Sequence, residues 1–423
     1  MVKYLGLPSI IGRSKIEVFA EVKEKVGRKL AGWKGKLLSI GGKEIMIKAV
    51  AQVVHTYTMS YFLIPKGLCE EIERMIRKFW WGQRQEESKI AWVSWEKMCR
   101  AKSNGGMGFR NFQAFNLAML AKQGWRLLSN PDSLCAKVFK VRYYPNGDVL
   151  NSKLGCSYTW RSIFKGLEVF RKGSRWRVGN GRLIHIWEDK WLPTPTTYKV
   201  ISPPRLFDDF LMVSALIDED TRRRKVDTLK SLFLPFEVET ILNILLSYSL
   251  PEDKIIWVGN KKGEFSLKSA YYVAPFVINS SDSGECPHGD PRTPLWKRIW
   301  QLKIPPKIRI FTWKACVNAL PTMSNLRRRG VNTDGLCPVC GLEAESICHA
   351  LLKCGSVKRI LDLWNESPIV IRAENMDFSY LALNLVDAGT PRDMELLVVV
   401  VWTIWHSRNL RVFEVVSQGA EQV

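Results

Sequence analysis

Four of the ten cysteines lie within 18 residues of one another, in the segment CPVCGLEAESICHALLKC. Two residues separate Cys337 from Cys340, and four separate His349 from Cys354. Zn2+ prefers thiolate and imidazole ligands and takes four of them at the corners of a tetrahedron. The spacing therefore predicts a tight loop that supplies two ligands and a helix or its edge that supplies two more. Binding free energy then becomes folding free energy, which constrains this segment more than any other feature of the chain.

Cys348 leaves a second ligand set open, because it could replace His349 and give an all-thiolate site. We favour Cys337, Cys340, His349 and Cys354 for the spacing of the last two, with Cys348 in the core. Four protein ligands fill the coordination shell, which is typical of a structural zinc, since a catalytic zinc keeps one position for water. The alternative interpretation is a chance cluster of core cysteines.

The remaining sequence argues against an extracellular or membrane protein. The N-terminus MVKYLGLPSI lacks the charged head, apolar stretch and small-residue cleavage site of a secretory signal. We therefore expect reduced cysteines and an intracellular chain, with the nucleus and the cytoplasm both open. No apolar run approaches the ~18 residues of a membrane span. No membrane and no small-molecule substrate is predicted as a partner, and the oligomeric state is left open.

The charge of the chain is strongly basic and unevenly distributed. The net charge is +22, and +21 of it falls in residues 1–200. Such an excess favours a polyanion partner, of which RNA and DNA are the commonest. The alternative is a solvated basic surface with no specific partner. Two groups of arginines are the candidate phosphate contacts: Arg175, Arg177 and Arg182, and Arg327, Arg328 and Arg329.

Hydrophobic periodicity predicts a mainly α-helical, multi-domain protein with short β-hairpins. Apolar residues recur at steps of three and four over 16–33, and further helices are predicted after Ser39 and after Pro65. Hairpins are predicted at 173–193, with Asn180-Gly181 at its turn, and at 255–267. The tryptophans of the first hairpin could stack bases, but we favour a core role for them.

Two further stretches are interpreted from their glycine and polar content. Gly105-Gly106-Met107-Gly108 predicts a tight turn or a backbone that lies close to another group, and it lacks the Gly-Lys-Ser/Thr of a phosphate loop. Residues 278–293 are rich in Ser, Gly, Pro and Asp and are the predicted linker. The predicted segments are a thumb-like basic helical region at 1–100, a basic Trp-rich region at 101–200, a connecting region at 201–277, the linker at 278–293, a zinc-binding domain at 294–375 and a tail helix at 376–423.

Six short motifs occur in order along the chain besides the cysteine segment. They are YLGLP at 4–8, GWKGKLLS at 32–39, FWWG at 79–82, GGMGFRN at 105–111, RWRVGNG at 175–181 and WTIWHSRN at 402–409. Together they resemble the C-terminal part of reverse transcriptase polyproteins of plant LINE-type (non-LTR) retrotransposons. Residues 266–364 resemble the reverse-transcriptase zinc-binding domain, whose Cys-x2-Cys…His-x4-Cys pattern falls on Cys337, Cys340, His349 and Cys354.

The resemblance implies RNA-directed DNA polymerase activity for the whole polyprotein, with a ribonuclease H domain after the tail helix. The family's polymerase carboxylates would precede the YLGLP motif, and the ribonuclease H acids would follow Glu414. Asp208-Asp209 does not match the Tyr-x-Asp-Asp pattern, because Leu206 stands where the aromatic residue should be. We therefore expect no catalysis from this chain alone and interpret it as a noncatalytic, nucleic-acid-binding fragment. The alternatives are an accessory part of an active polymerase and ribonuclease H, and a domesticated or decayed protein-interaction scaffold.

Overall fold

The computed structural model describes most of the chain. The described residues are 3–4, 7–8, 11–34, 38–82, 89–145, 147, 149–152, 154–155, 157–194, 197–204, 212–279, 290–364, 377–414, 418 and 422. The Asp208-Asp209 pair, residues 280–289 of the predicted linker and parts of the YLGLP and GWKGKLLS motifs lie outside them. No helix among the described residues combines the length and apolar character needed to span a membrane.

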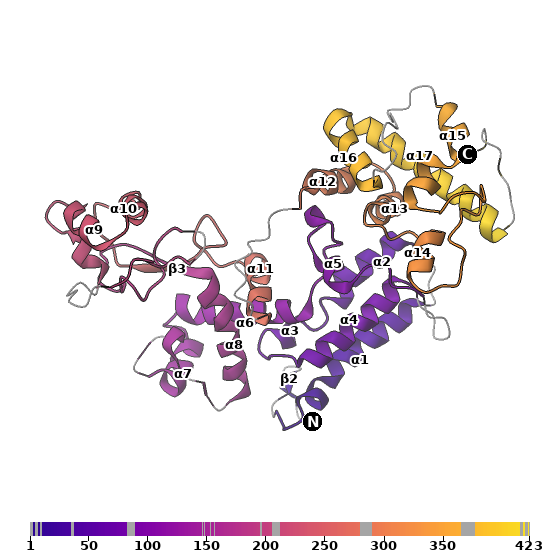
Figure 1. Cartoon of the computed structure of the whole chain (residues 1–423). Helices are drawn as coiled ribbons and strands as arrows, with labels where there is room; N and C mark the ends of the chain where they lie inside the picture. Colours follow the sequence, from indigo (N-terminus) through magenta and orange to yellow (C-terminus); the bar gives the residue numbers. More distant parts are fainter. Residues whose placement is uncertain are drawn as a thin grey trace. The chain divides into compact units, whose positions relative to one another are not determined.

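The chain is mainly helical with a few short antiparallel strands, as the sequence predicts (Figure 1). It divides by packing into two compact units. The first unit holds residues 1–19, 55–66 and 112–286, and the second holds residues 20–54, 67–111 and 287–423. The six segments predicted from the sequence stay predictions about domain boundaries.

The first unit contains all six short strands that the structure describes. Its elements are β1 (Lys3–Tyr4), β2 (Leu7–Pro8), α3 (Thr56–Met59), α6 (Phe112–Ser129), α7 (Leu134–Tyr143), η3 (Val149–Asn151), α8 (Tyr158–Gly173), β3 (Ser174–Arg177), η4 (Val213–Leu216), β4 (Ile217–Asp218), β5 (Arg223–Arg224), α9 (Val226–Leu232), α10 (Pro235–Leu242), β6 (Lys254–Trp257) and α11 (Leu267–Ile278). The neighbouring strands β1 and β2, and likewise β4 and β5, pair as antiparallel hairpins.

Helices α6, α8 and α11 form the main core of this unit (Figure 1). The approach of α6 to α8 is close, because glycines stand where a larger residue would collide. A Cβ on Gly124 would lie 2.4 Å from Leu167, and one on Gly166 would lie 2.6 Å from the backbone of Ala121. Buried Asn116 adds polar contacts, since its side chain accepts from the N–H of Ile64 and donates to backbone carbonyls.

The two hairpins predicted at 173–193 and 255–267 are wrong in their pairing. Strand β3 comes from the first and β6 from the second, and these strands pair with each other, with Arg175 opposite Ile256. The expected tight turn requires positive φ at both of its central residues. Gly181 has a φ of 73°, but Asn180 does not adopt a positive φ. The chain after β3 therefore does not reverse into a neighbouring strand.

The tryptophans of this region belong to a core, as predicted. Trp191 is fully buried, and Trp176 and Trp187 pack against the same cluster, which includes Leu216 and Ile241. The indole N–H of Trp191 donates to the carbonyl of Ile186 at 2.9 Å. These rings are occupied by internal packing.

The regular elements described in the second unit are helices, apart from an isolated β-bridge between Leu336 and Ala344. Its elements are α1 (Lys15–Lys34) and α4 (Lys66–Trp80), which lie mostly in it, and α2 (Ile40–Met46), η1 (Ile47–Ala51), α5 (Trp95–Cys99), η2 (Lys102–Asn104), α12 (Thr293–Gln301), α13 (Pro306–Cys316), α14 (Met323–Arg328), η5 (His349–Lys353), α15 (Gly355–Asp362), α16 (Phe378–Ala388), α17 (Pro391–Asn409) and η6 (Leu410–Glu414).

The predicted N-terminal helices form with the predicted faces inward. Helix α1 buries Phe19, Val22, Val26, Leu30 and Trp33, whereas Ile16 of the same stripe is 58% exposed. Ser39 caps α2 by accepting from the N–H of Gly42, and α4 follows Pro65. Short polar side chains at such positions satisfy amides that have no partner within the helix.

The glycine turn at 105–108 is both tight and closely packed, as predicted. Gly105 and Gly108 have φ values of 73° and 68°. A Cβ on Gly105 would lie 2.9 Å from the ring of Trp296, and one on Gly106 would lie 2.1 Å from the carbonyl oxygen of Arg100. The indole N–H of Trp313 on α13 donates to the carbonyl of Gly105 at 2.9 Å. Only glycine fits here, and the turn fixes one side of α13.

Candidate metal centre

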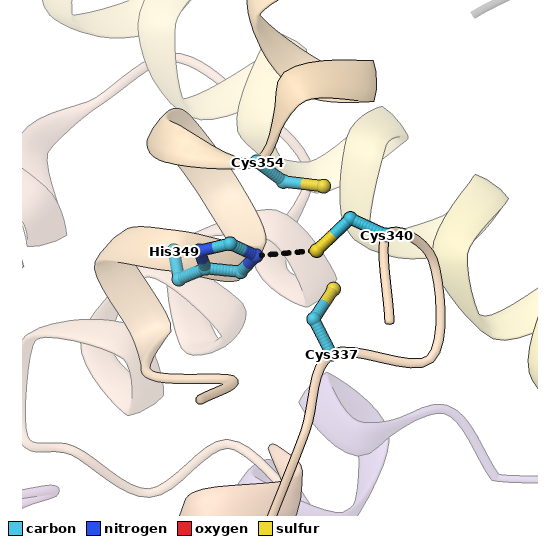
Figure 2. Close-up of side chains that lie close together, drawn as sticks. All are labelled: Cys337, Cys340, His349 and Cys354. Carbon is cyan, nitrogen blue, oxygen red and sulfur yellow. Dashed lines mark hydrogen bonds between the residues drawn. The ribbon is translucent and has the colours of Figure 1, made fainter. Parts of the chain in front are cut away.

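Four side chains from the cysteine segment face a common point. The ligand atoms of Cys337, Cys340, His349 and Cys354 all lie within 4.8 Å of one another. Figure 2 shows the three sulfurs and the imidazole ring turned toward one another, with Nε2 of His349 3.3 Å from Sγ of Cys340. Three of these residues are buried and Cys340 is half-buried.

The local backbone explains why these residues meet. The chain turns back after Cys337, whose carbonyl accepts from the N–H of Gly341 at 2.7 Å, and Gly341 has a φ of 71°. The N–H of Cys337 in turn donates to the carbonyl of Glu343 at 2.8 Å. The other two ligands stand at helix ends, since His349 begins η5 and Cys354 immediately precedes α15.

Glu343 orients the imidazole ring. Its Oε2 lies 3.0 Å from Nδ1 of His349. An ionised carboxylate can only accept, so Nδ1 carries a proton, and in the neutral ring the lone pair is then on Nε2, which faces the sulfurs. A carboxylate bound to the outer nitrogen of a ligand histidine fixes its tautomer in metal sites. Glu343 was not predicted as part of the site, although it lies only three residues after Cys340 in the sequence.

The two knuckle thiols are in different electrostatic environments. Hydrogen bonds from the backbone of Leu342 lower the pKa of Cys340 to about 6, with a further contribution from Glu343. Burial raises the pKa of Cys337 to about 12. The turn therefore directs its amides at one sulfur and stabilises negative charge there, which suits a thiolate ligand.

Cys348 is not part of this group. It is half-buried, and the pKa of its thiol is raised, mainly by burial and also by the nearby carboxylate of Asp377. The geometry thus brings together the four residues that spacing favoured. The donor set of three sulfurs and one imidazole fits Zn2+ and would fill its tetrahedral shell.

A buried ion pair joins the cysteine loop to α17. Arg408 donates from Nε and Nη2 to the two carboxylate oxygens of Glu345, at 2.8 and 2.7 Å. Both side chains are almost completely buried, with exposures of 4% and 0%. The N–H of Met323, at the start of α14, donates to the same carboxylate at 2.7 Å. Arg408 belongs to the WTIWHSRN motif, and its partner was not predictable from spacing.

The first group of candidate phosphate contacts is mostly engaged within the first unit. Arg175 is half-buried and donates to the carbonyl of Trp191, and burial lowers the pKa of its guanidinium. Arg177 is exposed at the end of β3. Arg182 is exposed and forms an ion pair with Glu219 at 2.8 Å.

The second group lies at the end of α14, in the second unit. Arg327, Arg328 and Arg329 are all exposed. Arg327 donates to the carbonyl of Asp334 at 3.4 Å, and Arg329 donates to the carbonyl of Trp92 at 2.9 Å. These acceptors are neutral carbonyls, so they do not neutralise the charges of Arg327 and Arg329.

A knuckle with two cysteines, followed by a histidine and a cysteine at helix ends, has the donor set of a Cys3His zinc site. Residues 265–360 match the family model described as zinc-binding in reverse transcriptase. The match contains all four ligand residues and extends from α11 into α15.

Two proteins of Arabidopsis thaliana are similar to this chain. The "Putative ribonuclease H protein" is 27% identical over 96% of this chain and 66% of its own length, so the chain spans just under two thirds of that relative. An "Uncharacterized mitochondrial protein" is 36% identical over 33% of this chain and 93% of its own length. The chain belongs to the family of reverse-transcriptase-related, retrotransposon-like proteins, and it carries their zinc-binding domain.

Proposed function

We propose that this chain is a noncatalytic nucleic-acid-binding part of a LINE-type reverse transcriptase, built around a structural zinc. The observation that carries the proposal is the convergence of Cys337, Cys340, His349 and Cys354 inside a segment that matches the reverse-transcriptase zinc-binding family. When bound, the ion would neutralise the thiolates and join the knuckle to η5 and α15. Glu343 would orient the His349 ring for binding the ion.

The buried ion pair connects the zinc module to helices α14 and α17. Glu345 lies between the knuckle and η5, and it holds Arg408 of α17 and the start of α14. The chain after the knuckle cannot shift without moving this carboxylate. The zinc would thereby fix α14, which ends in three exposed arginines, and α17.

The charge distribution supports a nucleic acid as the partner. The excess of +21 in residues 1–200 and the exposed arginines of both units would attract phosphates. Neutralised phosphates release counterions, so the affinity should fall steeply as salt rises. RNA and DNA share this chemistry, and both belong in the test.

Fluorescence anisotropy with labelled RNA and DNA oligonucleotides tests the proposal on the full chain. We expect binding at low salt and a log–log salt slope of about −0.7 for each phosphate contacted on a single strand. Changing Arg327 and Arg328 to Gln should weaken binding and flatten the slope. The matched control changes Lys261 and Lys262 to Gln, since these are also consecutive and exposed. Absence of affinity for every oligonucleotide at low salt would contradict the proposal.

A second candidate is an accessory part of an active RNA-directed DNA polymerase and ribonuclease H. It is favoured by the relative named as a ribonuclease H protein, of which the chain spans 66%. Primer extension and RNA–DNA hybrid cleavage separate the two candidates. This chain alone should give neither product under the noncatalytic proposal, and measurable synthesis or cleavage would overturn it.

A further inference from the structure

A groove of about 650 Å³ lies within the second unit and is lined by four tryptophans. Trp81 follows α4, Trp92 precedes α5, and Trp402 and Trp405 belong to α17. Apolar residues of α13 and the chain after it, including Phe311, complete the floor. We call this feature the Trp–Lys groove, because three lysines also line it.

Three of the four tryptophans are half-buried and Trp405 is buried, and two of the rings already make stacking or cation–π contacts. Trp402 is half-buried, and its ring lies parallel to that of His406, with a 4° interplanar angle. Nζ of Lys307 lies 4.4 Å from the Trp402 ring centroid, and Nζ of Lys314 lies 5.1 Å from that of Trp81. The indole N–H of Trp81 is buried with no hydrogen-bond partner among the described residues.

The groove is positively charged. Lys89, Lys307 and Lys314 line it, and its described lining residues include no acid. Burial, with the nearby Lys43, lowers the pKa of Lys314 to about 8. Burial, with Lys89, also lowers the pKa of Lys43. Neither Lys307 nor Lys314 forms an ion pair with any residue that the structure describes. Lys43 thus lies close enough to repel both Lys314 and Lys89, and an anion in the groove would relieve that repulsion.

Aromatic rings beside cations are what single-stranded nucleic acids bind. Bases stack on the rings regardless of their sequence, and the cations track the phosphates. A duplex buries the faces of its bases and offers only phosphates. An acidic peptide would satisfy the lysines but would leave the flat rings of Trp92 and Trp402 without a matching surface.

We propose that the Trp–Lys groove binds a single-stranded nucleic-acid segment, with bases on its tryptophans and phosphates at Lys307 and Lys314. This inference rests on the proposed nucleic-acid binding and assigns it a place. Arg329 donates to the carbonyl of Trp92, so the arginines of α14 continue the basic surface beyond the groove. Helix α17 also carries Arg408 one turn after Trp405, which couples the groove wall to Glu345 of the zinc loop.

Anisotropy with a labelled 12-nucleotide oligo(dT) and with a 12-base-pair duplex tests the groove in the full chain. We expect Trp402→Leu to weaken oligo(dT) binding by about 10-fold or more, since a stacked base contributes substantially to affinity. Duplex affinity should change by less than about 2-fold, because duplex bases do not stack on protein rings. Trp402→Phe keeps a ring and should restore most of the affinity.

The matched controls come from the same unit but from outside the groove. Trp300→Leu removes a half-buried ring that also has a lysine over it, at 4.0 Å, and should leave oligo(dT) binding unchanged. Lys307→Gln should flatten the salt slope by about one contact. Lys297→Gln, which removes an exposed charge on α12, should leave the slope unchanged.

The outcomes separate the two proposals. If the unaltered chain binds no oligonucleotide, the proposed function fails together with the groove. If the chain binds but Trp402→Leu and Lys307→Gln bind oligo(dT) as well as the controls do, the groove assignment is wrong and the proposed function stands. Equal losses for oligo(dT) and duplex, or for Trp402→Leu and Trp300→Leu, would also overturn the assignment. Should Trp402→Leu fail to fold, the comparison of Lys307→Gln with Lys297→Gln still decides it.

Discussion

Two loops of this chain have little regular structure, and each is organised around buried polar atoms. In the cysteine loop, four ligand atoms converge from residues 337–354. In the Gly-Asn-Gly loop after β3, the carboxylate of Asp253 accepts from the N–H groups of Gly179, Gly181 and Leu183, at 2.7 to 2.9 Å. The first loop brings electron-rich atoms together and needs a cation. The second brings donors to an acceptor and needs nothing from outside.

The difference also lies in what the glycines do. Gly341 in the first loop has open space where a Cβ would stand, so only its φ of 71° requires glycine. In the second loop, a Cβ on Gly179 would lie 2.0 Å from the carbonyl oxygen of Pro251. A Cβ on Gly181 would lie 2.5 Å from the backbone nitrogen of Ser214. The cysteine loop leaves space beside its glycine, whereas the carboxylate loop is closely packed around Gly179 and Gly181.

Removing the metal should have the largest effect. Cys337→Ser with Cys340→Ser should reduce the zinc content from about one ion per chain to near zero and unfold residues near 330–364, since structural zinc binding supplies ~10–16 kcal/mol in small modules. Elemental analysis and hydrogen exchange measure both changes. Cys348→Ser is the matched control and should keep its zinc. Loss of zinc from Cys348→Ser would instead favour the all-thiolate site, with Cys348 as a ligand in place of His349.

Breaking the ion pair tests whether the metal loop is held by its ion alone. Arg408→Met leaves the Glu345 carboxylate buried without its cation, which should cost about 3–5 kcal/mol of unfolding free energy. Arg411→Met, exposed one turn later, is the control and should have little effect. Denaturant titration of the zinc-loaded protein measures the difference. Equal stability of the two variants would show that the Glu345–Arg408 ion pair does not contribute to the unfolding free energy.

A substitution in the carboxylate loop tests whether the two loops are independent of each other. Asp253→Asn keeps one acceptor oxygen but replaces the other with an NH2 group, which is a donor and faces the N–H groups of the loop. We therefore expect a loss of about 1–3 kcal/mol of unfolding free energy. Its zinc content should stay unchanged, because Asp253 lies in the other packing unit. Asp220→Asn changes an exposed carboxylate and serves as the control. A drop in zinc content with Asp253→Asn would mean that the loops are not independent.

Lys314 is a buried charge with neither a metal nor an ion-pair partner among the described residues. Changes at this residue should have the smallest effect on stability. Its pKa is lowered to about 8 by burial and by Lys43, whereas the unfolded side chain keeps its proton to about 10.5. The folded state therefore loses this proton first, and stability should rise by about 1 kcal/mol between pH 7 and 9. Lys314→Met should be more stable than the unaltered chain at pH 7, and the gap should narrow by pH 9. Denaturation midpoints at both pH values check this, with Lys297→Met as control; a gap independent of pH would contradict it.

Local patterns in the sequence were sufficient for much of the helical architecture. Helix α1 follows from apolar periodicity, and α2 and α4 follow Ser39 and Pro65 as predicted. The cysteine segment was equally accessible, because all four side chains lie within 18 residues and their spacing restricts how they can meet. In each case, the deciding interactions join residues close in sequence.

The failures share the opposite property. The predicted hairpins were wrong because β3 pairs with β6, and the loop that would have turned β3 back is held by Asp253 instead. Nothing near residue 180 signals a carboxylate more than seventy positions away. The Glu345–Arg408 pair and the Trp–Lys groove are likewise assembled from distant segments, so periodicity and spacing could not reveal them.

The sequence by itself determined where helices begin, which faces are apolar, how charge is divided along the chain and which residues can bind a metal. Those properties depend on backbone preferences and side-chain chemistry within a few residues. Only the tertiary structure decided which strand pairs with which, which carboxylate faces which arginine and which tryptophans share a groove. Such pairings depend on how distant segments pack, and a linear pattern does not encode the distances between them.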